Sequence, residues 1–210
     1  MTMTRLLCLL LTLFFMTVPA IAEEQPSTAL VVYFSVPENV DLNGVDAVAG
    51  ASVMVKNDVR YGNVEYVARL IANASGADLW RIETAHQYPL EHDALLDAAA
   101  DEQDANARPV LMGTIEDIEL YDRIFLGFPN WWYDLPMPLY SFLESYDLSG
   151  KEIMPFTVHG GSGFSGALNT IAELQPEALV YEKGLSVSRN AVTDCETHVA
   201  EWLGGFMENE

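Results

Sequence analysis

The amino-acid sequence predicts an α/β protein built on a doubly wound, five-stranded parallel sheet. Five apolar segments of strand length alternate along the chain with segments of helical periodicity. The strand segments are continuous apolar runs, as expected for parallel strands that are covered on both faces. The chain has 210 residues, of which 50% are hydrophobic, and contains no internal repeat or linker. This size and composition fit one domain with a sizeable core.

The first 22 residues have the features of a secretory signal peptide. Arg5 precedes an apolar stretch, and the small-x-small pattern Ala20-Ile21-Ala22 marks a cleavage site. The apolar stretch is short for a transmembrane helix, although a retained membrane anchor is the alternative. We therefore expect a signal peptide at residues 1–22, cleavage after Ala22, a single domain at residues 23–210, and export, with the periplasm as the expected compartment.

The net charge and the cysteine and histidine content argue against several classes of function and site. The formal net charge is −21, which disfavours binding to nucleic acid or to an anionic membrane surface. Solubility alone would explain this charge, and docking to a basic redox partner would use it. After cleavage Cys195 is the only cysteine, so no internal disulfide is expected. The four histidines are scattered, and we expect no metal site.

The first half of the domain contains two predicted strands and two predicted helices. The strands lie at residues 28–35 and 78–84, and the helices at 62–76 and 90–106. Residues 36–61 have no clean period and are predicted to be a long loop with a short β segment at 51–56. Asn63 is a suitable N-cap for the first helix, and Gly76 is suited to end it.

The second half continues the alternation of strands and helices. Predicted strands at residues 122–128, 153–158 and 179–187 are separated by helices that begin at Pro136 and near residue 165. Pro129 should end the third strand because it has no N–H to donate. The last helix, at residues 192–206, is predicted to begin with a capping box formed by Thr193 and Glu196.

Three loops carry the candidate binding residues. They follow the first, third and fourth strands, whose carboxyl ends meet at one crevice in a doubly wound sheet. The candidates are Ser35 with the helix start at Gly62, Asn63 and Val64; the loop Pro129, Asn130, Trp131, Trp132 and Tyr133; and the loop His159, Gly160, Gly161, Ser162 and Gly163.

Each of these loops fits a different part of flavin mononucleotide (FMN). The glycines let backbone N–H groups approach a ligand, and the aromatic side chains can stack on a flat ring system. Ser35 and the helix N-terminus at Asn63 can hold a phosphate. The alternative for the three aromatic residues is that they cap the core. His159 is expected to hydrogen-bond the ring, and a role as proton donor is the alternative; no catalytic residue is assigned.

The same segments resemble the flavodoxin-like family over essentially the whole mature chain. The matching stretches are residues 32–35, 121–132, 142–144 with 150–151, and 159–163. They are similar to the branch with paired tryptophans after the third strand and a His-Gly-Gly-Ser-Gly loop. The resemblance implies noncovalent FMN, the strand order 2-1-3-4-5, and electron-transfer or reductase chemistry.

The chain departs from the family pattern at the phosphate loop. Members usually carry a Ser/Thr-x-Thr-Gly-Asn-Thr-like turn or a longer loop that ends in Gly-Asn-Thr, whereas residues 35–39 lack the glycine-rich turn. The distal Gly62-Asn63 is retained, but Val64 replaces the threonine. Loss of one hydrogen bond to a charged group weakens binding by about 1.5–3 kcal/mol. Glu38 would weaken phosphate binding further if it lies nearby.

Several functions stay open at this point. A hydrolase would need a Gly-x-Ser-x-Gly motif, and the segment around Ser162 lacks it. A non-catalytic module with weak or no FMN binding is the main alternative to a flavoprotein. Within the flavoprotein hypothesis, the protein is an electron carrier or an NAD(P)H-dependent flavin- or quinone-type reductase. The expected partners are a redox protein or a small quinone-like acceptor, with no nucleic acid and no stable membrane insertion after cleavage.

Overall fold

The computed structural model describes residues 29–37 and 52–207, and its centre is a parallel sheet. The predicted signal peptide and residues 38–51 of the predicted long loop lie outside the described residues. The sheet has the order β10-β8-β7-β1-β4, with β9 paired to β8 off this path. The strands are β1 (Ala29–Tyr33), β4 (Asp78–Arg81), β7 (Arg123–Pro129), β8 (Glu152–His159), β9 (Leu179–Val180) and β10 (Leu185–Ser188). Counted as five parallel strands, this is the predicted order 2-1-3-4-5, which is confirmed.

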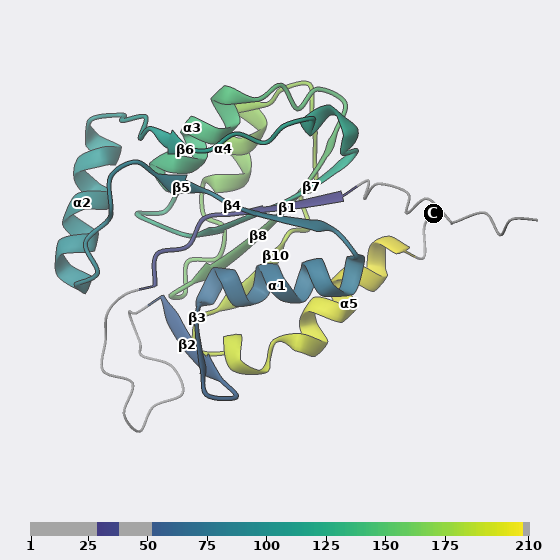
Figure 1. The fold of residues 1–210 in the computed structure, drawn as a ribbon, viewed down its shortest axis with the longest axis horizontal. Coiled ribbons are helices and arrows are strands. Elements are labelled where there is room, and N and C mark those ends of the chain that lie inside the picture. The colour runs from purple at the N-terminus through teal and green to yellow at the C-terminus, as the bar shows by residue number, and fades with distance from the viewer. Residues whose placement is uncertain (1–28, 38–51, 208–210) are drawn as a thin grey trace, which may run out of the picture.

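Helices cover both faces of this sheet (Figure 1). Helices α1 and α5 lie on one face, α3 and α4 lie on the other, and α2 stands beside the carboxyl ends of the strands. Their bounds are α1 (Asn63–Ser75), α2 (His92–Asp104), α3 (Met137–Ser145), α4 (Ala167–Leu174) and α5 (Glu196–Met207), with the 3-10 helices η1 (Ile118–Leu120) and η2 (Val192–Asp194). The arrangement is the predicted doubly wound α/β fold.

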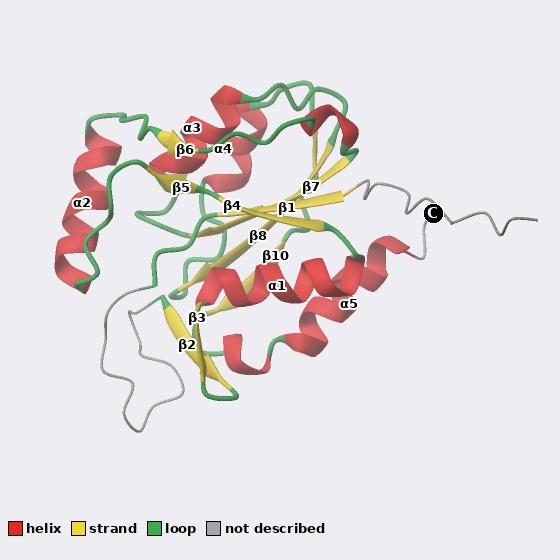
Figure 2. Cartoon of the chain, in the orientation of Figure 1, coloured by secondary structure: helices red, strands yellow, loops and turns green. Residues whose placement is uncertain are grey.

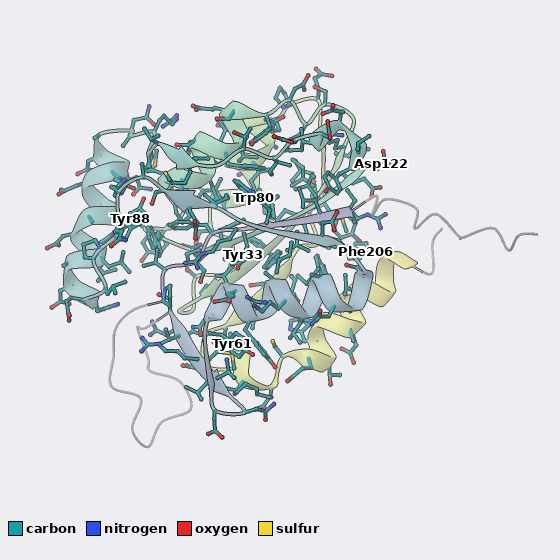
Figure 3. All side chains as sticks on the ribbon, viewed as in Figure 1. Tyr33, Tyr61, Trp80, Tyr88, Asp122 and Phe206 are labelled. Carbon is teal, nitrogen blue, oxygen red and sulfur yellow. The ribbon has the colours of Figure 1, made fainter. Side chains whose placement is uncertain are left out.

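The core has two halves because successive side chains of a strand point to opposite faces. On β1 and just after it, Leu30, Val32 and Phe34 pack with the α3–α4 side, while Val31 and Tyr33 pack with the α1–α5 side. Figure 3 shows Tyr33 between the sheet and α1. All five of these side chains are buried. Burial on both faces explains why the strand sequences are continuous apolar runs.

Gly127 is required by a close approach between two central strands. It pairs in register with Phe156 of the neighbouring strand. A Cβ atom at position 127 would lie 2.1 Å from the Phe156 ring. The Phe156 side chain therefore occupies the space above Gly127, and this glycine in the middle of a buried strand serves packing.

Two predicted strands are interrupted in the structure. Residues 78–84 form β4 and then, after Ile82, the short β5 (Glu83–Thr84), which leaves the sheet and pairs with β6 (Leu111–Met112). Residues 179–187 likewise divide into β9 and β10. Gly184 lies between them, where a Cβ would meet the Pro155 carbonyl oxygen at 2.5 Å. Apolar composition predicted the strands, but not these local departures from the ladder.

The third strand ends at Pro129, as the sequence predicted, although Pro129 is itself part of the strand, one residue beyond the predicted bound. It is the last residue of β7 and pairs with Val158, and the next N–H, of Asn130, donates to the Val158 carbonyl at 3.2 Å. At the final position of a strand the missing donor removes only one bond from the ladder, so proline is tolerated there.

The end of the predicted long loop is a β-hairpin (Figure 2). Strands β2 (Val53–Lys56) and β3 (Val59–Gly62) pair antiparallel around Asn57 and Asp58, which have φ values of 51° and 62°. Asparagine and aspartate tolerate this left-handed conformation, which two-residue hairpin turns require. Only the first strand had been expected, as a short β segment.

The N-cap of α1 lies one residue earlier than predicted. Gly62 is the N-cap, in place of Asn63, and its N–H donates to the Glu65 carboxylate at 3.3 Å. Gly76 ends the helix in the left-handed conformation, with φ of 72°, as predicted.

The predicted capping box of the last helix is wrong. Residues 192–194 form η2, and α5 begins at Glu196. The Glu196 carboxylate pairs with Lys56 at 2.7 Å and accepts a hydrogen bond from the Tyr66 hydroxyl at 2.6 Å. The bonds from Lys56 and then Tyr66 lower the pKa of Glu196 to about 2. Glu196 therefore ties the β2–β3 hairpin and α1 to α5, and this tertiary contact replaces the local cap.

Candidate functional site

A cavity lies at the carboxyl ends of the central strands, where a doubly wound sheet binds its ligands. It is bordered by the start of α1, by the loops after β7, β8 and β10, and by one face of α2, and its volume is about 140 Å³. Its lining residues are Ser52, Asn63, Val64, His92, Leu95, Leu96, Ala99, Pro129, Asn130, Trp131, Trp132, Val158, His159, Gly160 and Arg189.

Eight of the predicted site residues line this cavity, and six do not. The eight are Asn63, Val64, Pro129, Asn130, Trp131, Trp132, His159 and Gly160. Ser35, Gly62, Tyr133, Gly161, Ser162 and Gly163 lie outside its lining. Gly163 still supports the site, because its carbonyl oxygen accepts a hydrogen bond from the Asn130 side chain at 2.8 Å. The three predicted loops are therefore neighbours in space.

Ser35 and Gly62 are in direct contact with each other, outside the lining of the cavity. A Cβ at Gly62 would lie 2.2 Å from the Ser35 hydroxyl oxygen, so only glycine fits at this position. Ser35 is 3% exposed, and its hydroxyl oxygen has no hydrogen-bond partner among the described residues. Buried polar atoms are nearly always bonded, so the unpartnered Ser35 hydroxyl at the predicted phosphate loop is a candidate contact for a ligand.

Two backbone N–H groups at the start of α1 donate hydrogen bonds within the protein. The Gly62 N–H donates to Glu65, and the Asn63 N–H donates to the Ser52 carbonyl at 2.7 Å. The Glu65 carboxylate is also paired with Arg69 at 2.9 Å. A helix N-terminus attracts anions through free N–H groups and the helix dipole, and here a carboxylate of the protein occupies part of that position.

The paired tryptophans have different environments. Trp131 and Asp134 exchange backbone hydrogen bonds of 3.1 and 3.0 Å, which closes a two-residue turn at Trp132 and Tyr133. The Trp131 ring packs edge-on against Phe34 and Tyr88, with centroids 5.4 Å away in each case. Figure 3 places Tyr88 on the α2 side of the molecule. Trp131 therefore belongs to the wall of the core.

Trp132 and Tyr133 form the exposed tip of this turn. They are 47% and 71% exposed and have φ values of 47° and 66°. The Trp132 indole N–H donates to the Leu96 carbonyl of α2 at 3.0 Å. Left-handed backbone at residues other than glycine costs of order 1–3 kcal/mol each and is concentrated at ligand clamps and switch regions. The left-handed backbone and the exposed rings make this tip a candidate ligand contact.

Asp134 anchors the same turn to the helices behind it. One of its carboxylate oxygens accepts hydrogen bonds from the Tyr140 hydroxyl at 3.0 Å and from the Thr170 hydroxyl at 3.1 Å. Its other oxygen accepts from the Leu135 N–H at 2.8 Å. The base of the aromatic turn is thus fixed to α3 and α4.

His159 has a defined tautomer. Its Nδ1 accepts a hydrogen bond from the Gly161 N–H at 2.9 Å, so the proton of the neutral ring is on Nε2. Burial lowers the pKa of His159, which favours this neutral form. Gly161 has φ of 139°, a conformation that needs glycine. The ring can therefore act as an Nε2–H donor at the edge of a ligand.

Sequence reasoning missed the contribution of α2 and of Arg189. Helix α2 was predicted, but nothing in its sequence placed His92, Leu95 and Leu96 over the crevice. Arg189 follows β10 directly, and a cation just after the carboxyl end of a parallel strand was a usable signal.

The fold and the position of this cavity define the class of protein as an α/β protein with a ligand crevice at the carboxyl ends of a 2-1-3-4-5 sheet. A family model described as flavodoxin matches residues 53–205. The chain belongs to the flavodoxin family.

Solved structures share the fold. A protein from Bacteroides eggerthii provisionally described as a flavoprotein is 23% identical, with a TM-score of 0.59, and the match covers 85% of this chain and 97% of that one. A flavoprotein from Lactobacillus acidophilus in complex with FMN is 16% identical, with a TM-score of 0.55 and coverage of 80% and 97%. No protein in the curated collection of characterised sequences matches significantly.

Proposed function

We propose that this protein is an exported FMN-binding flavoprotein that acts in electron transfer or as an NAD(P)H-dependent flavin- or quinone-type reductase. One observation carries the proposal: a single cavity is bordered by the start of α1, the aromatic turn after β7 and the His159–Gly160 loop after β8. Membership of the flavodoxin family and a structural neighbour crystallised with FMN support flavin as the ligand.

The residues present fit FMN in their chemistry. The orphaned hydroxyl of Ser35 beside Gly62 is suited to a phosphate oxygen. The Trp132 ring offers an aromatic surface, and the Nε2–H of His159 offers a donor to the acceptor edge of a flavin. When bound, FMN would supply one- and two-electron redox chemistry, while these residues hold and orient it.

The cavity must widen to admit the whole ligand. Its volume of about 140 Å³ is below the ~300–1,000 Å³ that is usual for cofactor sites. The contact between the Trp132 indole and the Leu96 carbonyl joins the aromatic turn to α2 across the opening. We expect this hydrogen bond to break when the flavin binds, and the Trp132 ring then to stack on the flavin ring.

The test is flavin binding by the purified protein. Titration with FMN should quench tryptophan fluorescence, because a stacked flavin lies against Trp132, and the bound flavin should show a shifted visible spectrum that bleaches on anaerobic reduction. Absence of quenching and of a spectral change at millimolar FMN would refute the proposal.

A non-catalytic flavodoxin-like module with weak or no FMN binding is the second candidate. The position of the Glu65 carboxylate at the start of α1, together with Val64 in place of a threonine, favours it. An added negative charge opposes phosphate binding, and a missing hydroxyl removes one of its hydrogen bonds. The same titration separates the two candidates.

Export is part of the proposal and rests on residues 1–22, which lie outside the described residues. Among the described residues, no helix has the length and apolar character needed to cross a membrane. N-terminal sequencing of protein from the exported fraction should begin at Glu23. Recovery of a chain that retains Met1 would contradict cleavage after Ala22.

The exposed tip of the aromatic turn is the surface proposed to meet an electron partner. Trp132 lines the cavity and Tyr133 is the exposed residue next to it, on a strongly acidic protein. The proposed partner is therefore a basic redox protein or a small quinone-like acceptor.

A further inference from the structure

Arg189 is a cation in the wall of the cavity, and its guanidinium has no carboxylate partner in the part of the chain that the structure describes. Its guanidinium lies over Gly160, where a Cβ would be 3.1 Å from one terminal nitrogen. Its Nε is buried and has no hydrogen-bond partner among residues 29–37 and 52–207. The backbone N–H of Arg189 donates to the His159 carbonyl at 2.9 Å, which fixes the start of the loop after β10. A guanidinium that is partly removed from water without a partner is costly, so an anion is expected beside it.

Most other basic side chains in the described part of the chain have acceptors. Arg69, Arg108 and Arg123 are paired with carboxylates at 2.6–2.9 Å, and Lys56 is paired with Glu196. Arg81 donates to the Ser35 carbonyl at 3.1 Å. In a chain with 31 acidic and 10 basic residues, carboxylate partners are abundant. It is therefore informative that the buried Nε of Arg189, at the border of the ligand cavity, has no acceptor among the described residues.

Arg189 lies where it can compensate for the phosphate-binding groups that the start of α1 lacks. Arg189 lines the same cavity as Asn63 and Val64, the first residues of that helix. The helix start lacks the threonine hydroxyl of the family pattern, and two of its N–H groups are bonded within the protein. A positive charge delivered from the loop after β10 can supply the attraction that the phosphate loop does not.

We propose that Arg189 is the phosphate-binding cation of this site and that it gives the protein its preference for FMN over riboflavin. The second part rests on the proposed flavin function, and the first part does not. The guanidinium presents several donors that match phosphate oxygens, so it can neutralise and orient a phosphate monoester. Ser35, whose buried hydroxyl has no partner among the described residues, lies outside the cavity lining beside Gly62, so the proposal rests on Arg189 alone.

The test compares FMN and riboflavin affinities in the wild type, Arg189→Gln and Arg189→Lys. The Arg189→Gln variant should bind FMN about ten- to a hundredfold more weakly, the range for loss of a charge-assisted hydrogen bond, with riboflavin affinity unchanged. Arg189→Lys should recover part of the loss because it keeps the charge. The matched control is Lys183→Gln, an exposed residue outside the cavity, which removes the same charge and should leave both affinities unchanged.

Inorganic phosphate provides a readout that needs no flavin. Millimolar phosphate should raise the melting temperature of the wild type and of Lys183→Gln, and should do so less in Arg189→Gln, because ligand binding to the folded state stabilises it. Equal losses of FMN and riboflavin affinity in Arg189→Gln would place the guanidinium at the ring and overturn the proposal. Unchanged FMN affinity would overturn it as well.

The outcomes for Arg189 and for the flavin function are distinguishable. If the wild type binds neither flavin but phosphate stabilises it through Arg189, the anion site stands and the flavin function falls. If FMN binds and Arg189→Gln has no effect on FMN or on phosphate, the flavin function stands and this inference falls.

Discussion

Trp131→Ala should lower the free energy of unfolding by about 3 kcal/mol, at the lower end of the range for removal of a large aromatic side chain from a core. The Trp131 ring is partly buried and packs edge-on against Phe34 and Tyr88, so its removal leaves a void at the carboxyl end of β1 and β7. Urea denaturation followed by circular dichroism measures the change directly.

Trp132→Ala is the matched variant, because it removes the same side chain from the next position. Trp132 is 47% exposed and makes one side-chain hydrogen bond, to the Leu96 carbonyl, so the stability should change by only about 0.5 kcal/mol. The quench of tryptophan fluorescence by FMN should instead decrease. Equal destabilisation by the two variants would show that the difference in packing between the two rings has no energetic consequence.

Burial on both faces is what made the fold predictable from the sequence. Runs such as residues 124–128 are apolar at every position because α1 and α5 cover one face of the sheet while α3 and α4 cover the other. Because such runs alternate with segments of helical periodicity, only a few sheet topologies are compatible with the sequence. The particular strand order 2-1-3-4-5 was implied by the family resemblance. The glycine at the end of α1 was also predictable, because Gly76 adopts a conformation that few other residues tolerate.

The features that could not be predicted depend on contacts between distant segments. Thr193 and Glu196 have the spacing of a capping box, yet Lys56 and Tyr66 take the carboxylate because they meet it in three dimensions. Neither the placement of α2 over the crevice nor the opposite environments of Trp131 and Trp132 is encoded in local periodicity. Arg189 was overlooked for the same reason, since its significance depends on the cavity that other segments build around it.

Val64→Thr should tighten FMN binding by roughly tenfold while leaving riboflavin affinity nearly unchanged. Val64 lines the cavity at the second residue of α1, where a hydroxyl would restore the hydrogen bond that the family pattern supplies to the phosphate. One hydrogen bond to a charged group contributes about 1.5–3 kcal/mol, which corresponds to one to two decades in Kd. Paired titrations with FMN and riboflavin measure both affinities.

The Val64→Thr substitution should lower the free energy of unfolding of the protein when no ligand is present. Val64 is 1% exposed, and a buried hydroxyl without a partner costs about 1–3 kcal/mol. Val67→Thr is the control, because Val67 is equally buried on α1 but lies outside the cavity, so it should lose stability without gaining FMN affinity. If Val64→Thr tightens FMN and riboflavin equally, the phosphate does not lie at the start of α1, and Arg189 would have to hold it elsewhere in the cavity.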